Sequence, residues 1–147
     1  MWWKGLAILV VVIGLVVFWG SKEPSDQEQI QESLHNIVRG VADQNSRQVL
    51  TELSESYIDQ TGWTKKNIRG ILFQQFQQKE SFSLQIVPSA FDIQNPAADV
   101  TAKVTVFGGS MWNPNAETQI YLVSFAYEKE EDGVWRMQGH TREKWEE

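Results

Sequence analysis

Three side chains of types that enzymes use for proton transfer stand out in this sequence: Tyr57, Asp59 and His140. A buried aspartate can act as a general base, with a tyrosine as hydrogen-bond donor and a histidine as partner. The short run from Tyr57 to Gly62 is also typical of a turn, in which the aspartate accepts hydrogen bonds from backbone amides. We favour the turn, because aspartate is a preferred turn former. We expect His140 to be a solvated strand residue, because nothing in the sequence shows that it approaches Asp59.

Other site chemistries have no matching pattern. The chain has no cysteine, which excludes disulfides, thiolate metal sites, a thiol nucleophile and a lipid-modified N-terminal cysteine. Two histidines, His35 and His140, without an accompanying acidic spacing predict no metal site. No nucleophile elbow or phosphate loop is present, so we expect no cofactor. Lys103 and Arg136 suit an anionic ligand and ordinary surface charge equally well.

The N-terminal residues are almost wholly apolar. Residues 2–20 would span about 28 Å as a helix, close to the thickness of a bilayer core. Trp2, Trp3 and Trp19 flank the run, where aromatic rings prefer the headgroup layer. Large residues stand where a signal peptidase needs small ones, which favours an uncleaved anchor. We therefore predict a transmembrane helix over 1–20, a linker over 21–25 and one domain over 26–147.

Charge predicts where that domain lies. Lys4 precedes the span, whereas Lys22 is followed at once by Glu23, which favours a cytoplasmic N-terminus. The expected location is a bacterial inner membrane, single-pass, with the C-terminal domain in the periplasm. Beyond residue 20 the chain keeps all 19 acidic residues and loses only Lys4 of its 13 basic ones, so its net charge is −7. Such an acidic domain is not expected to bind nucleic acid.

Hydrophobic periodicity predicts the elements that position these side chains. Ser25 and Glu28 have the spacing of a capping box that opens a first helix. A short second helix follows 43–46, and Thr64 caps a third that runs to about Lys79, with its apolar residues, Phe73 included, facing inward. Alternating residues then predict four strands, over 81–88, 100–106, 120–127 and from Val134 onward. The fold class is α+β: three helices packed on a curved antiparallel sheet of about four strands.

The order of these elements, with the Tyr57-Ile-Asp59-Gln-Thr-Gly62 turn and the closing Asp132-Gly-Val-Trp135-Arg136 hairpin, resembles the nuclear-transport-factor-2-like (SnoaL-like) superfamily. The resemblance is to membrane-anchored bacterial members without defined activity. It implies a cone-shaped domain with a pocket between sheet and helices. Some members use that pocket for catalysis, whereas others only bind or assemble, often as dimers through the sheet. Fold alone does not choose between these roles.

Met111 and Trp112, in a glycine-rich loop, form a candidate contact patch, because exposed tryptophan and methionine concentrate at interfaces. The alternative is that Trp112 folds back over the mouth of the cone. The function that we expect is a non-catalytic binding or assembly module with a membrane-complex protein or a second copy as partner. The alternative is a proton-transfer or lyase enzyme that uses Asp59 and Tyr57.

Overall fold

The computed structural model describes residues 23–78, 82–108 and 118–145. The expected anchor, residues 1–20, lies outside these ranges, and so do Met111 and Trp112. Among the helices of the described ranges, none is long and apolar enough to cross a membrane.

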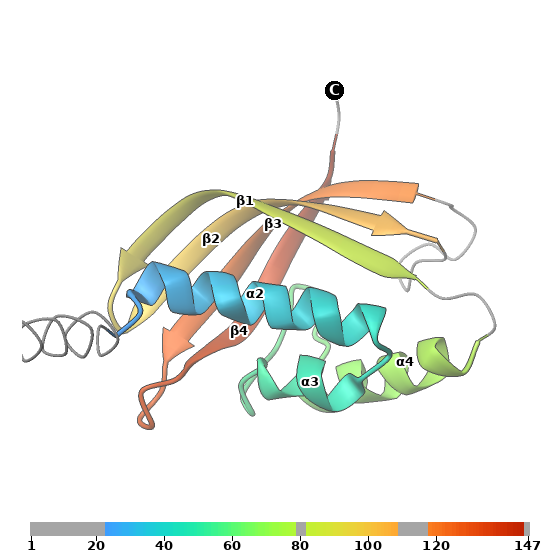
Figure 1. Cartoon of the computed structure of the whole chain (residues 1–147), viewed down its shortest axis with the longest axis horizontal. Coiled ribbons are helices and arrows are strands. Elements are labelled where there is room, and N and C mark those ends of the chain that lie inside the picture. Colours follow the sequence, from blue (N-terminus) through green and yellow to red (C-terminus); the bar gives the residue numbers. More distant parts are fainter. Residues whose placement is uncertain (1–22, 79–81, 109–117, 146–147) are drawn as a thin grey trace, which may run out of the picture.

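Three helices form where capping residues and apolar spacing predict them (Figure 1). Helix α2 (Asp26–Ala42) begins at the N-cap Ser25, whose Oγ accepts a hydrogen bond from the Glu28 amide at 3.2 Å. Helix α3 (Ser46–Thr51) is capped by Asn45. Helix α4 (Lys65–Gln77) is capped by Thr64, which forms a reciprocal capping box with Asn67.

One apolar residue of α4 does not face inward as predicted. Leu72 is buried, but the side chain of Phe73 is 63% exposed. At 100° per residue, the apolar positions from Ile68 to Phe76 cover more than a third of the helix circumference. Phe73 lies at one end of this arc, 100° around the helix from the buried Leu72. A helix that contacts the rest of the domain along one stripe cannot bury all of them.

The four strands form one antiparallel sheet in the order β1-β2-β3-β4, as the predicted meander requires. Their bounds are β1 (Ser83–Gln94), β2 (Ala97–Phe107), β3 (Thr118–Lys129) and β4 (Trp135–Lys144). The first strand does not end near Pro88, as predicted, but passes through it with a bulge between Pro88 and Ala90. Because β1 is an edge strand, it tolerates a residue that has no amide hydrogen.

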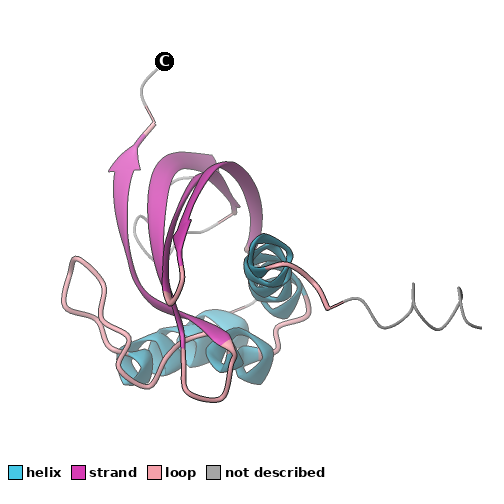
Figure 2. Ribbon diagram, turned by 90° about the vertical axis from the view of Figure 1, so that its left-hand side faces the viewer, coloured by secondary structure: helices cyan, strands magenta, loops and turns pink. Residues whose placement is uncertain are grey.

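The sheet curves around the helices and encloses the core on its concave side (Figure 2). Helix α2 packs against both edge strands of the curved sheet, β1 and β4. Alternate residues of the strands point into this space, which gives the half-buried pattern that period-two spacing predicts. The fully buried side chains include Ile30, Leu72, Val100, Val106, Val123 and Tyr127.

Candidate functional site

The segment between α3 and α4 runs along the outer edge of β4 and is bonded to it by its backbone. Leu53 and Met137 form a parallel bridge. Further along, the amides of Ile58 and Gln60 donate to the carbonyls of Gln138 and His140, at 3.0 and 3.3 Å. This ladder, which we call the edge segment (residues 52–60), places Tyr57 and Asp59 beside His140.

Gly139 makes the close approach of the edge segment to β4 possible. A Cβ atom at this position would lie 2.2 Å from the carbonyl oxygen of Ile58. A bulge between Ala126 and Tyr127 then shifts the β3–β4 register, so that His140 stands opposite Phe125, whose side chain is buried. The bulge therefore turns the His140 side chain toward Tyr57.

Tyr57, which is buried, and His140, which is partly buried, form a hydrogen-bonded pair, so His140 is not the solvated strand residue that the sequence predicts. The Tyr57 hydroxyl lies 2.6 Å from His140 Nδ1. Burial, together with the nearby Asp59 charge, raises the pKa of Tyr57, and burial lowers the pKa of His140. At neutral pH the phenol is therefore the donor and Nδ1 the acceptor, which places the imidazole proton on Nε2.

Asp59 organises the turn that follows it. Its Oδ1 accepts hydrogen bonds from the Thr61 amide at 2.8 Å, the Thr61 hydroxyl at 2.5 Å and the Trp63 amide at 3.1 Å. Burial opposes ionisation of this carboxyl, but the hydrogen bonds from Thr61 and Trp63 outweigh it and lower the pKa of Asp59. Oδ2 is buried and makes no hydrogen bond within the described part of the chain. Asp59 Oδ1 thus accepts the backbone hydrogen bonds that the turn interpretation predicts.

Replacing Asp59 with alanine is expected to lower the free energy of unfolding by about 2 kcal/mol, because three donors lose their acceptor. Asp59→Asn keeps an acceptor at Oδ1, so its loss should stay below about 1 kcal/mol. Urea denaturation of the two variants measures the difference. Equal losses would show that the negative charge, and not the turn geometry, is what Asp59 supplies.

Acid is expected to destabilise the domain through His140. The pKa of His140 in the fold lies below its unfolded value of 6.5, so between pH 7 and pH 5 the unfolded chain takes up the proton first. The free energy of unfolding therefore falls across this window. The stabilisation from Asp59 is lost at lower pH, below its unfolded pKa of 3.8.

Urea denaturation of wild type and His140→Gln at several pH values tests this assignment. The variant should show a flatter dependence between pH 7 and pH 5. His35→Gln is the matched substitution at an exposed histidine. An unchanged slope in His140→Gln would assign the acid sensitivity to another group.

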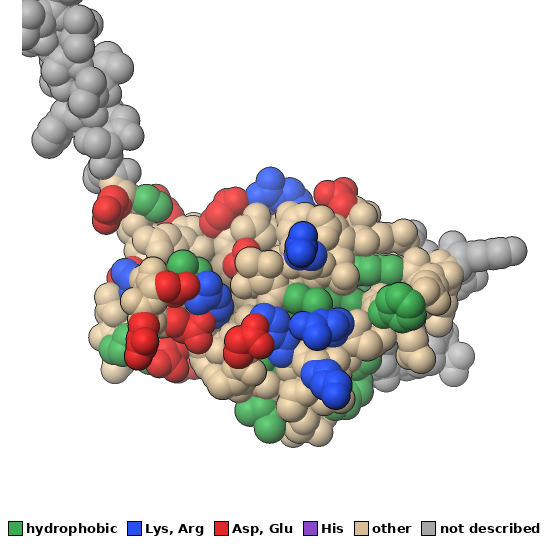
Figure 3. Space-filling model, turned by 90° about the horizontal axis from the view of Figure 1, so that it is seen from below, with side chains coloured by type: hydrophobic (Ala, Val, Ile, Leu, Met, Phe, Trp, Pro, Cys, Tyr) green, Lys and Arg blue, Asp and Glu red, His purple; other side chains and the backbone are tan. Residues whose placement is uncertain are grey.

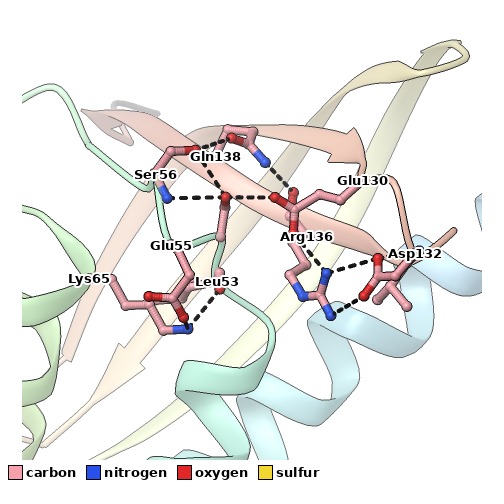
Figure 4. A network of polar contacts seen from close by, with 10 residues as sticks. Leu53, Glu55, Ser56, Lys65, Glu130, Asp132, Arg136 and Gln138 are labelled. Atoms are coloured by element: carbon pink, nitrogen blue, oxygen red, sulfur yellow. Dashed lines mark hydrogen bonds and ion pairs between the residues drawn. The ribbon is translucent and has the colours of Figure 1, made fainter.

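A second polar cluster joins the edge segment to the β3–β4 hairpin (Figure 4). Buried Ser54 donates to Glu130 at 2.9 Å, and Arg136 pairs with Glu130 and Asp132, each at 2.8 Å. These carboxylates raise the pKa of the Arg136 guanidinium. Arg136, a candidate for anion binding, therefore serves a structural network. Lys103, the other candidate, lies over the Trp145 ring, 5.2 Å from its centroid.

Sequence reasoning did not find Gly139 or Ser54. An isolated glycine within a strand is a signal of close backbone approach, and Gly139 carries that signal. No local pattern marks Ser54, because its partner Glu130 is 76 residues away.

The helical face of the domain segregates charge (Figure 3). Lys and Arg side chains gather near its middle, whereas Asp and Glu side chains gather toward one end. Exposed Lys66, Arg69 and Phe73 share one side of α4 at helical spacing. Aromatic residues and arginine are enriched at protein interfaces, whereas lysine is depleted there.

Comparison with known proteins supports the fold class. No protein-family model and no curated protein sequence matches this chain. Among solved structures, a nuclear-transport-factor-2-like protein of Cytophaga hutchinsonii is 13% identical, with a TM-score of 0.66 over 83% of this chain and 100% of that one.

Two further structures are similar. A ketosteroid isomerase-like protein of Erwinia carotovora atroseptica is 11% identical, with a TM-score of 0.60 over 80% of this chain and 95% of that one. The CaMKII hub of S. rosetta is 13% identical, with a TM-score of 0.65 over 84% of this chain and 100% of that one. The described domain therefore has the cone-shaped α+β fold of this class. At these identities the likeness shows a shared fold alone, and it agrees with the order of helices and strands that the sequence predicts.

Proposed function

We propose that this protein is a non-catalytic binding or assembly module, held by residues 2–20 at a bacterial inner membrane with its domain in the periplasm. The observation that supports a non-catalytic role is the engagement of Asp59 Oδ1 by three donors from its own turn. A carboxyl with a lowered pKa is a weak base at neutral pH. The Tyr57–His140 pair beside it is neutral and already hydrogen-bonded.

The outer face of the sheet is the proposed assembly surface. Leu122 and Trp145 line an open hollow there, together with Glu143 and Lys144. Trp145 is 38% exposed and carries Lys103 over its ring. One similar structure is described as a hub, which supports assembly through a domain of this shape. A second copy of the chain and a membrane-complex protein are the proposed partners, with Met111 and Trp112 as a further contact patch.

Sedimentation of the full chain in mild detergent tests this proposal. Leu122→Glu places a charge on the outer face and should dissociate a complex that forms through it, whereas Asp59→Asn with Tyr57→Phe should leave the complex intact. Trp112→Ala should weaken partner binding without changing the melting temperature. A monomer in wild type, with no co-purifying protein, would overturn the proposal.

The orientation has its own test. Protease added outside spheroplasts should digest residues 21–147, because the domain is proposed to face the periplasm. Survival of the domain in intact spheroplasts, with digestion only after lysis, would reverse the topology.

An enzyme of the proton-transfer or lyase type is the second candidate. The second carboxylate oxygen of Asp59, Oδ2, favours the enzyme. Unlike Oδ1, which organises the turn, Oδ2 is buried and has no hydrogen-bond partner in the described ranges. An enzyme would lose its turnover in Asp59→Asn although the fold remains, whereas a binding module would keep its partner.

A further inference from the structure

The two edges of the sheet differ in whether another segment pairs with them. The edge of β4 is covered by the edge segment, which satisfies its backbone groups. Strand β1 forms the other edge and, among the described strands, pairs with β2 alone. Over residues 83–87, no backbone hydrogen bond joins the outward side of β1 to any other described residue. An open edge of this kind presents donors and acceptors to an incoming strand.

A groove of about 370 Å³ follows this open edge. Its walls are formed from α2 by Gln31, Leu34, His35 and Val38, and from β1 by Leu84, Gln85, Ile86 and Pro88. Consecutive residues of a strand point to opposite faces of the sheet. A groove that touches Leu84, Gln85 and Ile86 together must therefore lie along the edge of the strand and not over one face.

Pro88 shows which backbone groups of β1 point outward. Proline has no amide hydrogen, so within a sheet it takes positions whose amide side faces away from the neighbouring strand. Residues two apart along a strand direct their backbone groups to the same side. The amides of Leu84 and Ile86 therefore point into the groove, and those of Gln85 and Val87 point toward β2.

We propose that this edge binds an extended, uncharged peptide segment of a partner protein as a fifth strand. Backbone hydrogen bonds to Leu84 and Ile86 would hold the peptide, and its alternate side chains would enter the space between α2 and β1. Residues 83–87 span about 17 Å, which accommodates about five residues of such a peptide. The proposal uses a surface separate from the outer sheet face, so it stands whether or not that face assembles.

The composition of the groove determines the chemistry of the occupant. None of its eight wall residues is Asp, Glu, Lys or Arg. A charged side chain that entered would lose its hydration without finding a partner, so Val, Ile or Thr at alternating positions fits best. A second copy fits less well, because α2 flanks β1 in each copy and two α2 helices would meet at the shared edge.

Residue-resolved amide exchange on the full chain tests the proposal. The probe is the heptapeptide Ser-Val-Thr-Val-Thr-Val-Ser, and the control peptide has the same composition without alternation, Ser-Val-Val-Val-Thr-Thr-Ser. Without peptide, the amides of Leu84 and Ile86 should exchange faster than those of Gln85 and Val87. The alternating peptide should slow exchange at Leu84 and Ile86 about tenfold or more, and the control peptide should not.

Three variants separate the edge from the fold. Leu84→Pro removes one outward amide while keeping the bonds to β2, and Val38→Lys places a charge in the groove from α2 without touching β1. Both should abolish the response to the peptide. Val87→Ala should retain it, because Val87 is 50% exposed and is not among the wall residues of the groove.

Two results would overturn the proposal. One is the absence of slowed exchange at Leu84 and Ile86 at millimolar peptide. The other is protection of these amides that grows with protein concentration when no peptide is present, which would make a second copy the occupant.

Discussion

Gly139→Ala is expected to destabilise the domain by about 3 kcal/mol or more. The new Cβ would meet the Ile58 carbonyl oxygen at 2.2 Å, and neither Ile58 nor the backbone that carries the Cβ can shift freely, because hydrogen bonds hold both segments in place. Relief requires the edge segment to move away from β4, which breaks the bonds that place Tyr57 beside His140. Urea denaturation followed by tryptophan fluorescence measures the loss.

Gly70→Ala is the matched control for this substitution. Gly70 lies within α4, and a Cβ atom there would meet nothing within 4 Å. Alanine should therefore stabilise the helix by about 0.5–1 kcal/mol. If Gly139→Ala behaved like Gly70→Ala, the close contact between the edge segment and β4 would be refuted.

Trp135→Ala is expected to cost about 4 kcal/mol of unfolding free energy. Trp135 is only 2% exposed, and its Nε1 donates to Asp26 Oδ1 at 3.0 Å. This hydrogen bond, followed by that from Lys129, lowers the pKa of Asp26. The indole thus fills the core and ties β4 to the first turn of α2.

Trp135→Phe separates these two contributions. It keeps most of the ring volume but loses the donor, so the expected loss is about 1–2 kcal/mol. Asp26→Ala removes the same hydrogen bond from the other side, and urea denaturation compares all three variants. A loss in Trp135→Phe as large as in Trp135→Ala would assign the stability to the hydrogen bond and not to packing.

Local signals in the sequence predicted most of the fold. The caps at Ser25 and Thr64 and the alternation that defines the strands act within a few residues, so they can be read without knowledge of the tertiary structure. The two errors share a cause. Phe73 is exposed and Pro88 is accommodated because of where their elements lie, on a peripheral helix and an edge strand, and neighbours in space decide that.

The site was less predictable than the fold. Tyr57 and His140 were each recognised by type, but their hydrogen bond joins positions 83 residues apart. It depends on Gly139 and on the bulge before Tyr127, and neither feature belongs to the pair itself. By contrast, the Asp59 turn was accessible from sequence, since its donors follow within four residues.

The covered edge of β4 limits how molecules of this domain can associate strand to strand. A sheet with two open edges behaves as a bifunctional monomer, because each pairing leaves another free end and growth continues into a fibre. Within the described residues, only β1 presents such an end. Growth at the β4 edge is therefore blocked, and two copies that paired through β1 would leave no open strand edge within the described residues, so strand-to-strand association of the domain itself would stop at a dimer.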